Sequence, residues 1–301
     1  MKKNYVLCAL MGLFFCGQSV ETQAQTTVLT DTTKAPKHWK RGMQTGVNLN
    51  QASFSSNWKG GGVNSIAVGL FFNGNANYET TKVSFTNDLQ LQYGFLKNDG
   101  QTVRKNADRI FLDSKFGYKL NTKWNLYAST NFSSQFDQGF EFSKDANGAE
   151  QQKLISRFFA PAYLTNSIGL EYKPVEYFWV RFGTGTLRQT FVTDTTLYRN
   201  IPKNYGVEIG KKVRNEAAFQ LSSSFDKDIA KNINLKVRYL AFANYETLRS
   251  IDNRLDVVIA AKVNKFVSVN LAGTLLYDED MDYKIQTSQT LAIGILYNFS
   301  E

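Results

Sequence analysis

Strict alternation of apolar and polar residues over long segments is the feature that most constrains the fold of this chain. In residues 291–299, large aliphatic or aromatic side chains occupy every second position. The same pattern runs through residues 83–95, 124–136 and 233–245. Because successive side chains of a β-strand point to opposite faces, the pattern predicts strands with one apolar face.

Twelve segments carry this strand pattern. They are residues 43–53, 64–78, 82–96, 106–120, 124–138, 154–173, 178–193, 211–225, 232–246, 254–263, 266–278 and 286–299. Most have about 11 to 16 residues, which exceeds the strands of globular sheets and suits a tilted membrane crossing. Beyond the first residues no apolar run is long enough for a spanning helix, which leaves a closed barrel. We expect an all-β fold, a transmembrane antiparallel up-and-down β-barrel of about 12 strands over residues 42–301.

The connections between these segments alternate in length. Short links fall at residues 79–81, 121–123, 174–177, 226–231 and 264–265, and longer ones at 54–63, 97–105, 139–153, 194–210, 247–253 and 279–285. Bacterial outer-membrane barrels have short periplasmic turns and longer external loops, so this alternation predicts that both termini are periplasmic. The alternative is a soluble β-sandwich, which would pack its apolar faces together.

The first residues have the three regions of a secretory signal peptide. Two lysines precede an apolar run from Val6 to Phe15, and a small-x-small cleavage pattern follows at residues 22–24. The run of about 10 residues is too short for a membrane anchor. We expect residues 1–24 to be a signal peptide removed after Sec export to the outer membrane, and residues 25–41 to be a disordered periplasmic lead-in.

The basic residues of the chain are scattered through strands and turns. The formal net charge is +9, but nucleic-acid binding is typical of clustered basic residues. We therefore expect no nucleic-acid partner. The expected partners are outer-membrane lipid and the barrel insertion machinery, with other envelope proteins as a further option.

Catalysis on the barrel would lack its usual base. The only histidine, His38, precedes the expected barrel, and hydrolases of this kind use a histidine to activate serine or water. The sequence therefore predicts that the protein is not an enzyme and has no catalytic residues and no cofactor.

Three aspartates in one expected external loop form a candidate metal site. Asp278, Asp280 and Asp282 have the D-x-D-x-D spacing with which a calcium loop begins. However, Tyr283 stands at the usual glycine position and Gln289 replaces the closing glutamate. A solvated loop is the alternative.

Charged residues between the apolar positions are expected to face the lumen. They are Asp88, Arg109, Asp113, Lys115, Glu171, Arg181, Arg214, Glu216, Lys236 and Arg238. Both signs are present. The leading hypothesis is a non-enzymatic outer-membrane channel for small hydrophilic solutes, selected by these charges. The alternative is a structural or assembly subunit of an envelope complex, its lumen plugged by buried ion pairs.

Several stretches together resemble a known family. They are residues 52–58, 60–62, 64–65, 104–108, 114–119, 159–163, 210–214, 263–266 and 276–280. Their order and spacing over roughly residues 42–300 are similar to outer-membrane barrels of Bacteroidota catalogued as domain of unknown function 3078. The resemblance implies an outer membrane of that bacterial group, and it implies no known activity, ligand or catalytic residue.

Overall fold

The computed structural model describes residues 38–53, 55, 63–194, 196–197, 203–264, 267–279 and 282–300, with the backbone alone described for residues 203–204, 282–283 and 296–300. The expected signal peptide and the lead-in up to residue 37 lie outside these residues. Within the described part of the chain, no helix is long and apolar enough to cross a membrane.

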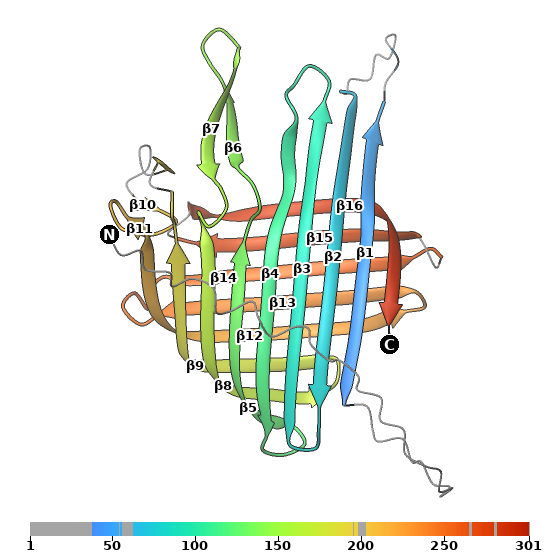
Figure 1. Ribbon diagram of the computed structural model, residues 1–301, viewed down its shortest axis with the longest axis vertical. Helices are drawn as coiled ribbons and strands as arrows, with labels where there is room; N and C mark the ends of the chain where they lie inside the picture. The colour runs from blue at the N-terminus through green and yellow to red at the C-terminus, as the bar shows by residue number, and fades with distance from the viewer. Residues whose placement is uncertain are drawn as a thin grey trace, which may run out of the picture. The chain divides into compact units, whose positions relative to one another are not determined.

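Twelve strands form a closed antiparallel barrel (Figure 1). They are β1 (Trp39–Ala52), β2 (Ser65–Glu79), β3 (Val83–Asn98), β4 (Arg104–Lys119), β5 (Trp124–Ser134), β8 (Ala162–Val175), β9 (Phe178–Phe191), β12 (Val213–Ala230), β13 (Ile233–Asn244), β14 (Ile251–Lys262), β15 (Val267–Asp278) and β16 (Asp282–Ser300). Pairing of β1 with β16 closes the ring, with Val47 opposite Ile295. The predicted all-β, twelve-strand up-and-down barrel is confirmed.

Two short hairpins lie in the connections between barrel strands. One consists of β6 (Gly139–Lys144) and β7 (Glu150–Ser156), and the other of β10 (Lys203–Asn204) and β11 (Val207–Glu208). The expected strand at 154–173 was therefore wrong at its start, because residues 154–156 belong to β7. The expected lead-in was wrong at its end, because β1 begins at Trp39 and pairs there with Tyr78 of β2.

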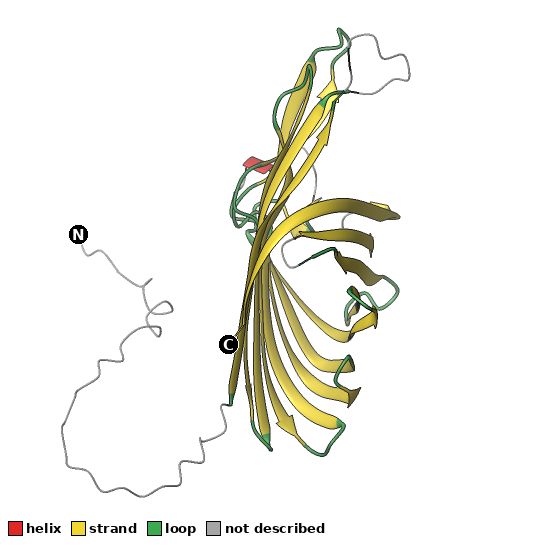
Figure 2. Cartoon of the chain, turned by 90° about the vertical axis from the view of Figure 1, so that its right-hand side faces the viewer, coloured by secondary structure: helices red, strands yellow, loops and turns green. Residues whose placement is uncertain are grey.

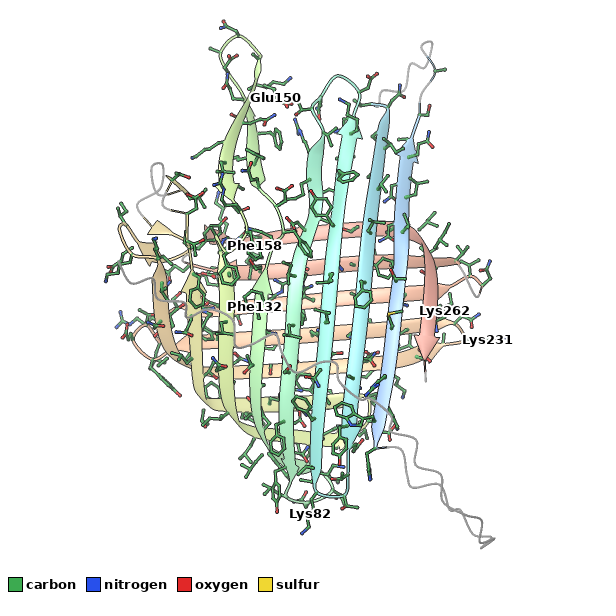
Figure 3. All side chains as sticks on the ribbon, viewed as in Figure 1. Lys82, Phe132, Glu150, Phe158, Lys231 and Lys262 are labelled. Carbon is green, nitrogen blue, oxygen red and sulfur yellow. The ribbon has the colours of Figure 1, made fainter. Side chains whose placement is uncertain are left out.

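The turns of the barrel define two different ends. Short turns lie at residues 80–82, 120–123, 176–177 and 231–232, β15 follows closely after β14, and we call this side the short-turn end. Lys82, Lys231 and Lys262 mark it in Figure 3, and both ends of the barrel sequence meet there, where Gly42 pairs with Ser300. The opposite long-loop end carries both hairpins, and Glu150 marks it.

Local sequence explains why the chain turns tightly at the short-turn end. The side-chain oxygen of Asn121 accepts hydrogen bonds of 2.9 Å from the backbone N–H groups of Lys123 and Trp124. In another turn Asn232 has a φ of 64°, a left-handed conformation that asparagine adopts more readily than most residues. Short polar side chains therefore stabilise turns at the places where the alternation is interrupted.

The outer face of the barrel is mainly apolar. Leu70, Ile168 and Ile295 are 56%, 59% and 65% exposed, and many other large apolar side chains share this face. Aromatic pairs lie at the short-turn end, with the rings of Trp124 and Tyr172 centred 4.8 Å apart. A soluble sandwich would bury such side chains between its sheets, so the closed barrel and its apolar exterior exclude that alternative.

Polar groups on the outer face are satisfied locally. The Ser114 hydroxyl donates to the Asn87 side-chain oxygen at 2.8 Å, and the Thr130 hydroxyl donates to Asn166 at the same distance. Each pair joins neighbouring strands, so these hydrogen bonds need no water. This is the arrangement that a hydrocarbon environment requires of polar atoms.

Candidate functional site

One long-range contact identifies the inner face of the barrel. Arg188 of β9 donates hydrogen bonds of 3.1 Å to Glu216 on the adjacent strand β12, and one of 2.8 Å to Asp252 on β14. Two strands, β12 and β13, lie between β9 and β14 in the ring. A side chain spans that interval across the concave side of the sheet, so this face lines the lumen.

The strand register places all ten of the charges expected in the lumen on this inner face. They are Asp88, Arg109, Asp113, Lys115, Glu171, Arg181, Arg214, Glu216, Lys236 and Arg238. Five of them belong to two ion-paired clusters, one nearer each end, and Lys236 pairs with Asp226 near the short-turn end. The remaining four form a central group: Asp88, Arg109, Asp113 and Arg238.

The Glu171 cluster lies nearer the short-turn end. Lys115 Nζ and Arg181 Nε each lie 2.7 Å from Glu171 Oε2, and Asn125 donates to the other carboxylate oxygen at 3.0 Å. Glu171 is 1% exposed, so the ionised carboxylate depends on these partners. Arg181 also lies over the Trp179 ring, 3.8 Å from its centroid.

The Glu216 cluster lies nearer the long-loop end. Glu216 is 4% exposed and pairs with Arg188 and Arg214, each at 3.1 Å. Asn244 donates to the same carboxylate at 3.2 Å, and Asp252 is the second acid bound by Arg188. Two arginines and two acids therefore balance one another here.

Sequence reasoning missed Arg188 and Asp252. A β-bulge explains the first omission: Gly183 pairs with Gly169 and Gly185 with Ile168, which leaves Thr184 as an extra residue. The bulge reverses the alternation, so Arg188 turns inward although its position matches the outer set before the bulge. Asp252 fell in an expected loop, because the strand was expected to begin at residue 254, whereas β14 begins at Ile251.

The central group contains charges without ion-pair partners. Asp88, Arg109 and Arg238 have no oppositely charged group within 4.0 Å in the described part of the chain, and all three are partly exposed. The Arg238 Nε atom is buried, and no described residue forms a hydrogen bond with it.

One further ion pair lies at this level. Arg254 Nε and Nη2 donate to Asp256 at 2.8 and 2.9 Å, and the Thr274 hydroxyl donates to the same carboxylate at 2.8 Å. Arg254 and Asp256 alternate with apolar residues, so this pair could have been predicted from the sequence.

At the long-loop end, loops and hairpins extend beyond the barrel strands (Figure 2). The β5–β8 and β9–β12 connections pack against each other there, and we call this packed region the cover. Ala160, Val192, Leu197 and Val207 form a buried apolar cluster within it. The Tyr205 hydroxyl donates to the Ile155 carbonyl at 3.0 Å, and burial raises the pKa of Tyr205. These residues come from the β5–β8 and β9–β12 connections, which the cover joins.

The cover lies directly on the Glu216 cluster. Gly206 has a φ of +76°, and a Cβ built there would lie 1.9 Å from the guanidinium of Arg214. The turn between β10 and β11 therefore touches the lumen wall with no room for a side chain. This contact couples an external connection to the ion pairs below it.

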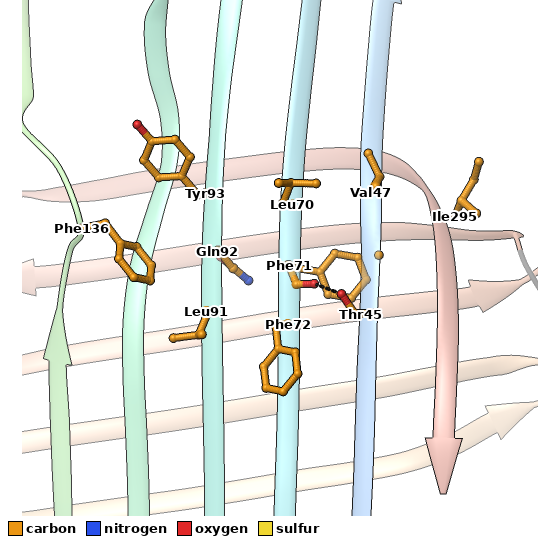
Figure 4. A pocket seen from close by; sticks show the side chains of 11 residues that line it. Thr45, Val47, Leu70, Phe71, Phe72, Leu91, Gln92, Tyr93, Phe136 and Ile295 are labelled. Atoms are coloured by element: carbon orange, nitrogen blue, oxygen red, sulfur yellow. Dashed lines mark hydrogen bonds between the residues drawn. The ribbon is translucent and has the colours of Figure 1, made fainter. Parts of the chain in front are cut away.

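A separate groove lies on the outside of the barrel (Figure 4). Its volume is about 510 Å³, and it runs over β1, β2 and β3. Most of its lining side chains face outward by register, including Val47, Leu70 and Ile295. It is therefore an apolar surface feature rather than part of the lumen.

The candidate metal site falls partly outside the described residues. Asp278 ends β15 and pairs with Asp282 of β16, whereas Asp280 is not described. Among the described residues, no three acidic, histidine or cysteine side chains are grouped so that they could hold a metal ion. A calcium site here stays a prediction.

Buried hydroxyl groups near the lumen contact one another. Ser167 lies 3.0 Å from the Tyr127 hydroxyl and 2.8 Å from the Thr186 hydroxyl. His38 lies instead at the short-turn end, with its Nδ1 3.2 Å from the Glu79 carbonyl. The Ser167 hydroxyl therefore contacts other hydroxyl groups and not the histidine of the chain.

Comparison with known proteins yields one family match and several distant structures. A family described as "Protein of unknown function (DUF3078)" matches residues 49–140. No curated protein matches the chain. The COG4313 outer membrane channel from Pseudomonas putida F1 is 9% identical with a TM-score of 0.40, covering 92% of this chain and 100% of that one.

Two further solved structures are similar at the same level. The translocator domain of the autotransporter NalP from Neisseria meningitidis is 9% identical with a TM-score of 0.35, covering 89% of this chain and 90% of that one. The CymD monoaromatic hydrocarbon channel is 12% identical with a TM-score of 0.34, covering the same shares.

Proposed function

We propose that this chain is a non-enzymatic barrel of a bacterial outer membrane whose lumen conducts small hydrophilic solutes. An apolar exterior with aromatic pairs at its edge supports a membrane location. The signal-peptide pattern of residues 1–24 supports export to that membrane. Membrane lipid is the proposed partner of the outer face, where the apolar groove over β1–β3 offers space for a hydrocarbon chain.

The central group of charges carries the proposal of a channel. Asp88, Arg109 and Arg238 are ionisable side chains without ion-pair partners in the described part of the chain. A charge removed from water without a partner is very costly. We therefore infer that water fills the lumen at this level, while the two ion-paired clusters narrow it on either side.

The position of the single histidine, outside the barrel strands, supports the non-enzymatic part of the proposal. The chain has a single histidine, and it lies at the short-turn end beside Glu79. The buried Ser167 is hydrogen-bonded to Tyr127 and Thr186, which are poor proton acceptors at neutral pH.

A closed structural subunit is the second candidate. The observation that favours it is the cover at the long-loop end, which lies on Arg214 above paired charges. Paired charges can fill a lumen permanently when every group is satisfied. Such a barrel would serve as a part of a larger envelope assembly.

Planar-bilayer recording distinguishes the two candidates. The purified, folded protein should give unitary currents at high salt if it is a channel, and a silent bilayer would contradict this. The structural subunit should instead yield a stoichiometric partner after crosslinking in native membranes. Recovery of the protein alone would contradict the second candidate.

A further inference from the structure

We propose that the central level of the lumen selects small zwitterionic solutes. The ammonium group of the solute would lie toward Asp88 and Asp113, and its carboxylate toward Arg238. This inference rests on the proposed channel function and adds a substrate class to it.

The acidic side of the lumen is built from two adjacent strands. Asp88 of β3 lies directly opposite Asp113 of β4 in the register, and both face inward. Like charges in this position repel each other and destabilise the sheet. No cation of the described residues forms an ion pair with either carboxylate, and the hydrogen bond from Asn131 to Asp113 is long at 3.4 Å. The pair therefore attracts cationic groups from the lumen.

The basic side lies on the opposite wall. In the ring of twelve strands, β13 is halfway around from β3, and β14 is halfway around from β4. Arg238 and Lys236 of β13 face inward, and both are close enough to Asp88 to act on its charge. Lys236 forms an ion pair with Asp226, with 3.0 Å between Nζ and Oδ2, whereas Arg238 has no ion-pair partner in the described part of the chain.

The Asp88–Asp113 pair and Arg238 together produce an electric field across the lumen, whereas Arg109 on β4 lies four residues nearer the long-loop end than Asp113. A simple cation or anion in this field is drawn to one wall and repelled by the other. A zwitterion that aligns its two charges with the field is attracted at both ends. A neutral molecule of the same size and composition lacks this gain, so the arrangement favours a zwitterion over its uncharged isomer.

Alanine and lactamide provide a matched pair of solutes, because they are isomers and alanine alone is a zwitterion at neutral pH. We would measure the swelling of liposomes that contain the folded mature protein, after subtracting the rates of protein-free liposomes. Alanine should enter several-fold faster than lactamide. In the double variant Asp88→Asn with Asp113→Asn, the ratio of the two rates should fall to about one, because the acidic wall is lost.

Two further variants make the test specific. Arg238→Gln removes the basic wall and should also lower the ratio, and it replaces the double variant if that protein does not fold. Lys227→Gln removes a charge that lies over the Tyr177 ring on the outer face, and should leave the ratio unchanged.

The outcomes separate the two proposals. Equal entry of alanine and lactamide through the unchanged protein would overturn the selectivity and leave the channel standing. Preference for alanine in both lumen variants would overturn the assignment to these residues. Absence of swelling with either solute would overturn the channel itself.

Discussion

Arg188 of β9 and Asp252 of β14 are joined by a 2.8 Å hydrogen bond across the lumen, although two strands lie between them in the ring. The same guanidinium binds Glu216, so Arg188 connects three strands near the long-loop end. The stability of this end should depend on the two acids to different degrees.

Replacing Glu216 should cost more than replacing Asp252. Glu216→Ala leaves Arg188 and Arg214 without their shared carboxylate, and we expect a loss of about 3 to 5 kcal/mol. Asp252→Asn removes one charged hydrogen bond while Glu216 still holds Arg188, so a loss of about 1 to 2 kcal/mol is expected. Urea unfolding in lipid vesicles measures both, with the exposed Glu141→Gln as the control. Equal losses in the two variants would contradict this account of the cluster.

Replacing the whole Glu171 cluster should change the stability of the barrel little, whereas replacing Glu171 alone should lower it. Glu171→Gln removes the charge shared by Lys115 and Arg181, and should destabilise the barrel by about 3 kcal/mol or more. The triple variant Lys115→Met, Glu171→Leu, Arg181→Met replaces all three with apolar side chains and should be close to the unchanged protein in stability. The same unfolding assay measures both. A triple variant weaker than the single one would show that the cluster is needed for more than charge balance.

Gly206→Ala should loosen the contact between the cover and the Glu216 cluster. A methyl group at residue 206 would collide with the Arg214 guanidinium, so the turn between β10 and β11 or the Arg214 side chain must shift and their contact is lost. We expect a larger unitary conductance in planar bilayers. Gly148→Ala is the matched control, because Gly148 also has a positive φ, of +82°, but a Cβ there meets nothing within 4 Å. Equal conductance changes in both variants would assign the effect to backbone strain alone.

The cover should also loosen in acid. The Thr196 hydroxyl donates a hydrogen bond that lowers the pKa of Asp194, and the charge of Arg157 acts in the same direction. A carboxyl whose pKa is lower in the folded state stabilises the fold above its unfolded pKa of about 3.9, and that contribution is lost as the pH falls through the folded value.

Limited proteolysis of residues 192–212 between about pH 7 and about pH 3 measures this effect, because aspartate side chains titrate within this range. Cleavage should increase below about pH 4 in the unchanged protein. Asp194→Asn should remove this part of the pH dependence, although Asp137 and Glu150, whose pKa values are also lowered, still titrate. An unchanged acid response in Asp194→Asn would refute the role of Asp194.

The barrel was predictable because one physical constraint acts on every strand. Leu291, Ile293 and Ile295 face outward, and the residues between them face inward. The inward orientation of Arg188 was not predictable from the sequence. The bulge at Thr184 depends on pairing with β8, and the local composition does not mark it. Residues 154–156 belong to an external hairpin, but their alternation of apolar and polar residues is the same as that of a barrel strand. The pattern alone could therefore not locate the start of β8.

Labelling of single cysteines decides whether the lumen contains water. The two cysteines of the chain, Cys8 and Cys16, lie within the expected signal peptide, so an introduced cysteine would be the only thiol of the mature protein. Asp88→Cys and Leu89→Cys lie on opposite faces of β3. A charged, membrane-impermeant thiol reagent should modify residue 88 in intact vesicles and leave residue 89 unmodified. Labelling of residue 89 with no labelling of residue 88 would contradict a water-filled lumen enclosed by a lipid-facing wall.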